Sequence, residues 1–184
     1  MVRPIVAIVA AILISRPDLP RDEATRYARV LRAEAKAHDF DPLTAVAIIH
    51  YESGWIPDIV SESGEDYGLG QIRARYIGAC RHDANPLHAP GAACRAVKRS
   101  LLVPENNIRQ MARLITNHRQ LCRDKTGSAK FHQWLASYQG RNYPKENRWC
   151  DADEKTWQVI RYRRWLVAEV PKRVKAQRNG KPSD

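Results

Sequence analysis

The stretch DPLTAVAIIHYESG, residues 41–54, decides how this chain folds, because it joins a strong helix start to an almost unbroken apolar run. Asp41 predicts the N-cap, since its carboxylate can accept otherwise unpaired amide hydrogens, and Pro42 suits the first helical position, where no amide hydrogen is needed. Residues 43–49 are nearly all apolar, so the helix is predicted to be buried on almost every side. Gly54 follows and ends it.

Segments on both sides of this helix show helical rather than strand periodicity. Residues 21–38 place apolar side chains at three- and four-residue spacing among charges, which is typical of an amphipathic helix. The same spacing returns in residues 104–121, 131–138 and 156–170. Residues 61–70 are rich in Gly, Ser and acidic side chains and predict a long irregular loop. Because no segment alternates over a strand's length, we expect an all-α domain of about five to seven helices with long loops.

The composition predicts one folded domain. A chain of 184 residues with 43% apolar side chains can bury one core but is short for two independent ones. We place the domain at residues 21–171. The basic residues 172–184, which include Gly and Pro, are expected to form a flexible tail.

The first 20 residues predict a location. The apolar run 4–15 is closed by Arg16 and Asp18 and has the length of a signal-peptide core, but it is short for a membrane span of about 20 residues. We therefore assign residues 1–20 to a signal peptide or signal anchor and expect an exported protein, periplasmic or extracellular. No clean small-x-small cleavage site follows the run, so a first element of the fold is the alternative.

Four cysteines with wide spacings predict disulfide bonds. No CxxC pair is present, which argues against a zinc ribbon or a thioredoxin-type redox pair. Disulfides fit an exported protein, and three pairings are possible. We favour Cys80 with Cys94 and Cys122 with Cys150, because each pair closes a local loop in a loop-rich stretch.

Glu52 is the residue whose position suggests chemistry. It lies at the carboxyl end of the apolar helix, where apolar surroundings and the negative end of the helix dipole both disfavour the charged form. Both effects raise the pKa of the carboxyl toward the range of a general acid at neutral pH. A lone Glu after an apolar helix is more often an exposed helix end, so the later segments decide between the two interpretations.

Two later segments supply groups for ligand binding. The first, DYGLGQI at residues 66–72, has two glycines that let the backbone approach a ligand and Gln71, whose amide both donates and accepts hydrogen bonds. The second, SYQG at residues 137–140, adds an aromatic face, another amide and a glycine. Together they favour a binding site around Glu52 over an exposed helix end.

In this order, the three segments resemble the motifs of the soluble lytic transglycosylase family, namely a Glu-Ser pair, a Gly-Leu-Met-Gln segment and an Ala-Tyr-Asn segment. The resemblance spans residues 40–142 and is most specific over residues 47–72. It departs from the family at Gly70, which replaces Met, and at Gln139, which replaces Asn. The DYG triplet is similar to small members that open the wall for secretion systems or phage, which adds such an assembly to the expected partners.

The resemblance implies a lysozyme-like helical fold whose cleft binds the glycan strands of peptidoglycan, with no cofactor. Glu52 would be the single catalytic acid and base. It would protonate the glycosidic oxygen and then take the proton of the muramic acid C6 hydroxyl, which closes a 1,6-anhydro ring. The substrate contacts that the resemblance implies are Ser53, Gly68, Gln71, Tyr138 and Gln139.

A lysozyme-type hydrolase is the main alternative. Glycoside hydrolysis normally uses two carboxylates, and Asp66 or Glu65 lies where goose-type lysozymes carry acidic residues. The DYG triplet favours the transglycosylase. A third hypothesis is a catalytically weak wall-binding protein that keeps the fold, because two motif positions depart from the family. The family also places a late-helix tyrosine near the acid; Tyr162 is a candidate, and Trp157 competes for that alignment.

Charge and histidines suggest other functions that carry less weight. The net charge of +11 fits nucleic acid, anionic lipid or a wall polymer with peptide carboxylates and does not choose among them. In residues 157–165 the aromatic side chains are expected to pack on the core and the arginines to face solvent. No nucleic-acid partner is therefore expected. The six histidines include no HExxH motif, and His82 with His88 lack a third ligand at a familiar spacing, so no metal site is expected.

Overall fold

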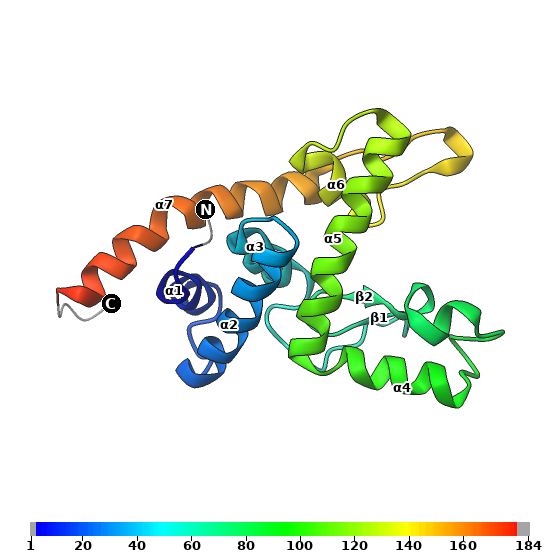
Figure 1. Ribbon diagram of the computed structural model, residues 1–184, viewed down its shortest axis with the longest axis horizontal. Coiled ribbons are helices and arrows are strands. Elements are labelled where there is room, and N and C mark those ends of the chain that lie inside the picture. The colour runs from blue at the N-terminus through cyan, green and yellow to red at the C-terminus, as the bar shows by residue number, and fades with distance from the viewer. Residues whose placement is uncertain (1–2, 180–184) are drawn as a thin grey trace.

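The computed structural model, which describes residues 3–179, consists mainly of helices (Figure 1). Within this range its α-helices are α1 Ile5–Ser15, α2 Arg21–Ala37, α3 Pro42–Glu52, α4 Ala92–Leu101, α5 Pro104–Thr126, α6 Phe131–Tyr138 and α7 Glu154–Arg178. A hairpin pairs β1 Asp66–Tyr67 with β2 Ile72–Arg73, and short 3-10 turns cover Ala74–Tyr76, Gly78–His82 and Pro144–Glu146. The predicted all-α fold class is confirmed.

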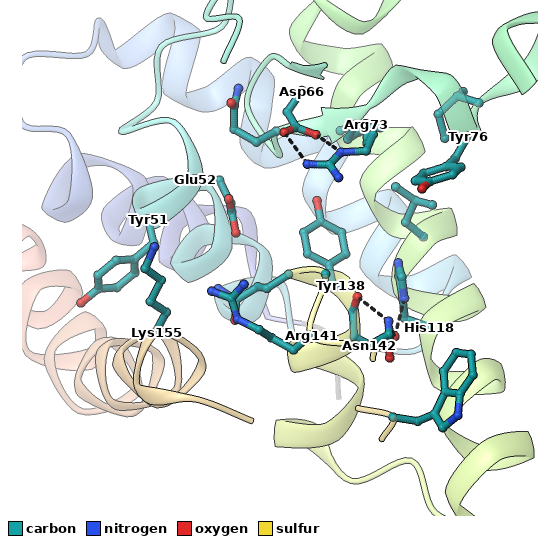
Figure 2. A pocket seen from close by; sticks show the side chains of 18 of the residues that line it. Tyr51, Glu52, Asp66, Arg73, Tyr76, His118, Tyr138, Arg141, Asn142 and Lys155 are labelled. Carbon is teal, nitrogen blue, oxygen red and sulfur yellow. Dashed lines mark hydrogen bonds and ion pairs between the residues drawn. The ribbon is translucent and has the colours of Figure 1, made fainter. Parts of the chain in front are cut away.

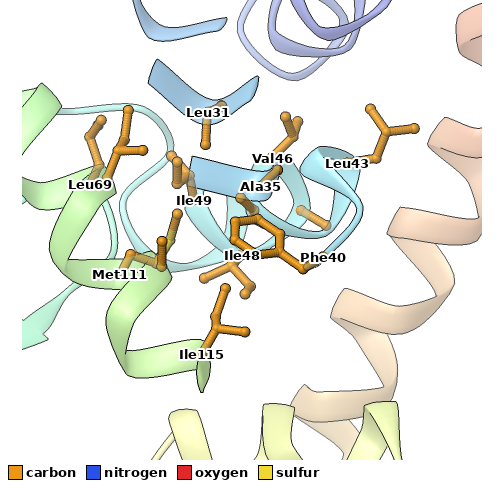
Figure 3. Close-up of a cluster of buried hydrophobic side chains, with 14 of the residues drawn as sticks. Leu31, Ala35, Phe40, Leu43, Val46, Ile48, Ile49, Leu69, Met111 and Ile115 are labelled. Carbon is orange, nitrogen blue, oxygen red and sulfur yellow. The ribbon is translucent and has the colours of Figure 1, made fainter. Parts of the chain in front are cut away.

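Helix α3 forms the centre of the core, as its sequence predicts. The Asp41 side chain accepts a hydrogen bond from the Leu43 amide at 3.0 Å and caps the helix start. Ile48 and Ile49 are fully buried. Figure 3 shows side chains of α2 and α5, among them Leu31, packed around this helix. The carboxyl end of α3, which carries Glu52, is therefore held rigidly by apolar contacts.

The apolar run at the start of the chain forms α1 and packs inside the fold. Ile8, Ala11 and Ile12 are fully buried, and α1 contacts α2, α3 and α7. Of the helices between residues 3 and 179, none is long and apolar enough to cross a membrane. In the structure, the run is therefore the first helix of the fold, which was the alternative to a signal peptide or signal anchor. Its assignment as an export signal stays a prediction.

Asp41 ties three parts of the chain together. Its carboxylate accepts hydrogen bonds from Arg3 at 2.8 and 3.0 Å and from Arg163 of α7 at 2.9 Å, besides capping α3. Burial acts to raise the pKa of this carboxyl, but the hydrogen bonds from Arg3 and the Leu43 amide and the charges of Arg3 and Arg163 together hold it below its usual value. The cap residue that the sequence identifies therefore also anchors α7 against α3.

The structure differs from the sequence predictions in two places. Residues 61–70, expected to be an irregular loop, include strand β1, because Gly68 with φ +68° turns the chain back into β2. Helix α7 continues to Arg178, so the tail expected from residue 172 is still helical there. Leu166, Val170 and Val174 recur every four residues against the core and carry the helix past its internal proline. Residues 180–184 lie outside the described range.

Both predicted disulfides form. Cys80 is bonded to Cys94, which joins the 3-10 turn Gly78–His82 to α4. Cys122 of α5 is bonded to Cys150 in the loop that precedes α7. The second bond matters for the site below, because it fixes that loop to α5.

Candidate active site

A cleft of about 870 Å³ opens at the carboxyl end of α3 (Figure 2). Its walls come from the end of α3, the β1–β2 hairpin, α5, α6 with the loop that follows, and the first turns of α7. Of the residues proposed from the sequence, Glu52, Asp66, Gln71, Tyr138 and Gln139 line it. The fold therefore brings the three motif segments to one cavity.

Glu52 is a cleft residue whose pKa is strongly raised. Burial raises its pKa from the usual 4.5 to about 7, and the nearby negative charge of Asp66 adds to the shift. Hydrogen bonding to Gln139 and the positive charges of Arg141 and Lys155 act in the opposite direction and do not cancel it. The carboxyl is thus suited to hold a proton near neutral pH and to release it.

Gln139 is oriented toward Glu52 by its neighbour on α7. Its side-chain oxygen accepts a hydrogen bond from the Thr156 hydroxyl at 2.9 Å. Thr156 is fully buried at the start of α7, which fixes this contact. The amide nitrogen of Gln139 is then free to donate to the Glu52 carboxylate, and that donation stabilises the charged form of the acid.

Tyr138 and Gly70 make one contact across the cleft floor. The Tyr138 hydroxyl donates a hydrogen bond to the Gly70 carbonyl oxygen at 2.8 Å. A Cβ at Gly70 would lie 2.7 Å from that hydroxyl oxygen and 3.3 Å from the sulfur of Met111. The space that a side chain at position 70 would need is therefore occupied by Tyr138, and the cleft is not enlarged there.

Asn107 of α5 secures the hairpin turn and was not identified from the sequence. It is fully buried and accepts a hydrogen bond from the Gly70 amide at 2.8 Å. Its own amide donates to the carbonyl oxygens of Tyr67 at 2.8 Å and Leu101 at 2.7 Å. The sequence could have indicated this role, because Asn107 lies on the apolar face of the helix predicted at residues 104–121. A buried side-chain amide there is costly unless it has hydrogen-bond partners.

The two candidate second carboxylates are both engaged by arginines. Asp66 accepts two parallel hydrogen bonds from Arg73, at 2.9 and 3.1 Å, directly across the hairpin. Glu65 lies 3.1 Å from Arg75 and is not part of the cleft lining. Only Asp66 therefore faces the cavity, and it does so as half of an ion pair (Figure 2).

The remaining predicted contacts take structural positions. Ser53 is buried in the turn after α3, where its hydroxyl donates to the Ile49 carbonyl and accepts from the Trp55 amide, both at 3.2 Å. Gly68 is buried against the end of α4, and a Cβ there would lie 2.3 Å from the Leu101 carbonyl oxygen. Neither residue lines the cleft. Both shape the backbone that presents Glu52 and Gln71.

The late-helix aromatics lie outside the cleft lining. Tyr162 bonds to the Ser15 hydroxyl at 2.9 Å and stacks on His50 with ring centres 4.2 Å apart. Trp157 stacks on His132. Tyr162 also packs edge-on against Tyr51, the neighbour of Glu52, with ring centres 5.8 Å apart. Neither Tyr162 nor Trp157 has a side chain in the cleft lining, and which of them corresponds to the family's late-helix tyrosine stays open.

These features define a lysozyme-like helical domain with a polar cleft around one half-buried acid. The family model described as the Transglycosylase SLT domain matches residues 29–142, more than half of the chain, and the chain belongs to that family. The match contains Glu52 and all three motif segments, while α1 and α7 lie outside it. Membership indicates transglycosylase-type, peptidoglycan-lytic activity in general, with peptidoglycan as the substrate. No curated protein and no solved structure matches the chain.

Proposed function

We propose that this chain is a lytic transglycosylase that cleaves the β-1,4 bond between MurNAc and GlcNAc and leaves 1,6-anhydroMurNAc ends. Glu52 is its acid and base. The observation that carries the proposal is the burial of this carboxyl in the cleft, which raises its pKa to about 7. An acid with that pKa is part protonated at neutral pH and can both give and take a proton in one cycle.

The reaction balances with one carboxyl group. Protonated Glu52 gives its proton to the glycosidic oxygen as the bond from that oxygen to the muramic acid C1 breaks. The N-acetyl group assists at C1, as the family resemblance implies. The Glu52 carboxylate then takes the proton of the C6 hydroxyl while the C6 oxygen bonds to C1 and the N-acetyl oxygen leaves C1. The amide of Gln139 and the charge of Arg141 stabilise the carboxylate between the two proton transfers.

The state of Asp66 favours this reaction over hydrolysis. A hydrolase needs a second carboxylate as nucleophile or as the base that activates water. Here both oxygens of Asp66 accept hydrogen bonds from the Arg73 guanidinium, which occupies them and holds them toward the hairpin. Glu65, the other candidate, lies outside the cleft lining. Asp66 acts instead on Glu52, whose pKa its charge raises.

The same proposal assigns substrate contacts and a location. Gln71, Tyr138 and Gln139 line the cleft beside Glu52 and are the residues that we propose to touch the glycan. The two disulfides fit an oxidising compartment on the side of the cell wall, periplasmic or extracellular.

The test is mass spectrometry of the products released from purified sacculi. Wild-type protein is expected to release anhydro-ended fragments, and Glu52→Gln is expected to release none while it still binds sacculi. The matched control is Glu62→Gln, the same change on an exposed side chain of the following loop, which should keep wild-type activity.

Three outcomes contradict the proposal in different ways. Full activity of Glu52→Gln removes the assigned acid. Wild-type products that are one water heavier than anhydro fragments identify a hydrolase, and Asp66→Asn then tests the second carboxylate. Binding of sacculi by the wild type without any product identifies a wall-binding protein.

A further inference from the structure

His118 of α5 lies in the cleft on the other side of Tyr138 from Glu52 (Figure 2). We propose that His118 is a substrate-binding residue, whose Nε2–H donates to an acceptor oxygen of an N-acetylated sugar, and that a hydrogen-bond chain from the Cys150 amide fixes its tautomer. The proposal rests on the proposed function, because it takes the cleft to hold a glycan strand. Neither the family motifs nor the acid chemistry requires this histidine.

The first hydrogen bond of this hydrogen-bond chain determines which atoms donate and which accept along it. The backbone N–H of Cys150 donates to the side chain of Asn142 at 3.0 Å. A backbone N–H can only donate, so the atom that it meets must be the oxygen of the Asn142 amide. The nitrogen of that amide then points to Ser137 and donates to its Oγ at 3.0 Å.

Ser137 links Asn142 to His118 in the hydrogen-bond chain. Its Oγ lies 2.8 Å from His118 Nδ1, and within residues 3–179 its hydrogen-bond partners are Asn142 and His118 alone. Oγ accepts from Asn142, and because Ser137 is buried its own hydrogen needs an acceptor, which of these two partners only the imidazole can provide. His118 Nδ1 therefore accepts, and a neutral imidazole that accepts at Nδ1 carries its hydrogen on Nε2.

The imidazole is neutral and its Nε2 opens into the cleft. Burial lowers the pKa of His118 to about 4, so the ring holds one hydrogen at neutral pH. In the described part of the chain Nε2 of His118 has no hydrogen-bond partner, and this nitrogen is not fully buried. The nitrogen therefore faces the open cavity, and the Tyr138 ring, 5.8 Å away centre to centre, packs edge-on beside the imidazole.

The surroundings of His118 select the class of ligand. A neutral N–H donor suits a carbonyl or hydroxyl oxygen, whereas a carboxylate is better matched by Arg or Lys. Leu114, one helical turn before His118 on α5, and Trp149, the residue before Cys150, also line the cleft and offer apolar and aromatic surface. A sugar with an N-acetyl group presents both an amide carbonyl and C–H faces. We therefore assign this end of the cleft to a sugar unit beyond the one at Glu52.

The Cys122–Cys150 disulfide links the two ends of this hydrogen-bond chain, which runs from the Cys150 amide to His118. Cys122 lies one helical turn after His118 on α5, and Cys150 supplies the amide at which the hydrogen-bond chain begins. Asn142 and Ser137 fill the distance between them. The disulfide thus supports the orientation of a side chain in the cleft as well as the stability of the fold.

The first test reads the tautomer directly in the full-length, oxidised protein. Nitrogen-15 NMR of the imidazole at pH 7 should show the hydrogen of His118 on Nε2. Ser137→Ala should allow the Nδ1–H form to appear, because the acceptor role of Nδ1 is no longer imposed. A wild-type His118 with its hydrogen on Nδ1, or doubly protonated at pH 7, overturns the proposal.

The second test measures affinity without turnover. In a Glu52→Gln background, His118→Phe should weaken binding of an N-acetylglucosamine tetramer about tenfold, the loss of one hydrogen bond. The matched control is His132→Phe on the neighbouring helix, where the histidine stacks on Trp157 outside the cleft. Unchanged affinity in a folded His118→Phe variant overturns the proposal. A wild type that binds this tetramer but never cleaves sacculi overturns the proposed reaction and leaves the role of His118 standing.

Discussion

Helix α3 and the opposite side of the cleft both present residues to the cavity, but they are held by different interactions. We call α3 the apolar wall, and the β1–β2 hairpin together with residues 137–150 the polar wall. The apolar wall is fixed by fully buried side chains such as Ile48 and Ile49. The polar wall is fixed by the Cys122–Cys150 disulfide and by hydrogen bonds between distant residues, such as Asn107 with Gly70 and Tyr138 with Gly70, which are 37 and 68 positions apart.

The difference follows from what each wall must place. Hydrophobic contact is non-directional and depends mainly on area, so it can hold a whole helix end and reduce the exposure of Glu52 to water. A hydrogen bond depends on the positions of individual atoms, so it can orient an amide or an imidazole. The apolar wall therefore raises a pKa, whereas the polar wall aims donors and acceptors. Four predictions separate these roles, beginning with the largest expected change in the free energy of unfolding.

Truncation in the apolar wall should cost the most stability. Ile49→Ala removes three carbons from a fully buried site and should lower the free energy of unfolding by about 4 kcal/mol. Urea denaturation followed by circular dichroism measures the change. Val60→Ala is the matched control, because Val60 is 41% exposed and its truncation should have little effect. A loss below that of the control would show that α3 is not the centre of the core.

Removal of the Cys122–Cys150 disulfide should cause the second-largest loss in the free energy of unfolding. Replacing both cysteines by serine opens a link across 28 positions and should lower the free energy of unfolding by about 3.5 kcal/mol. Because the bond joins the ends of the His118 hydrogen-bond chain, glycan affinity should fall as well. Removal of Cys80–Cys94 is the control, since it should destabilise the fold without changing the His118 tautomer. Equal effects of the two removals on affinity would argue against the chain.

The buried acid should make stability depend on pH. The folded-state pKa of Glu52, about 7, lies above the ordinary value of 4.5, so the folded state holds a proton that the unfolded state has lost between these values. The free energy of unfolding should therefore fall as pH rises from about 4.5 to 7, by up to about 3 kcal/mol. Glu52→Gln removes this dependence.

The measurement is the melting temperature of wild type and Glu52→Gln across that pH range. The variant should melt higher at pH 8, and the two curves should converge near pH 4. Activity of the wild type should decline as pH rises through about 7, because the first step needs the protonated acid. A difference between the curves that stays constant with pH would place the perturbed group elsewhere.

Loss of a polar-wall contact should have the smallest effect on stability and a larger one on activity. Asn107→Ala removes three hydrogen bonds at the hairpin turn and should lower the free energy of unfolding by about 2 kcal/mol. Cleavage of sacculi should fall more than this loss alone would cause, because Gln71 and Asp66 are carried by the same hairpin. Asn117→Ala, an exposed change on the same helix, is the control. Full activity of a destabilised Asn107→Ala would limit that residue to a structural role.

The accuracy of the sequence predictions follows the same division between the two walls. The start of α3 at Pro42 and the bounds of α6 were predictable, because capping and apolar spacing act over a few residues. The β1–β2 hairpin was missed, because its strands are only two residues long and its turn is held by Asn107 from another part of the chain. His118 was missed as well, since a single histidine on a helix carries no sign of what its two nitrogens will meet.

By itself the sequence determined the apolar helix, the placing of Glu52 at its end, and the motif order that marks the family. These depend on periodicity and on interactions within one segment, which a sequence displays directly. Only the tertiary structure decided that Asp66 is held by Arg73, that Ser53 and Gly68 stay outside the cleft, and that His118 opens toward it. Each of those outcomes depends on the distance and direction between particular atoms, and the spacing of residues along the chain does not encode them.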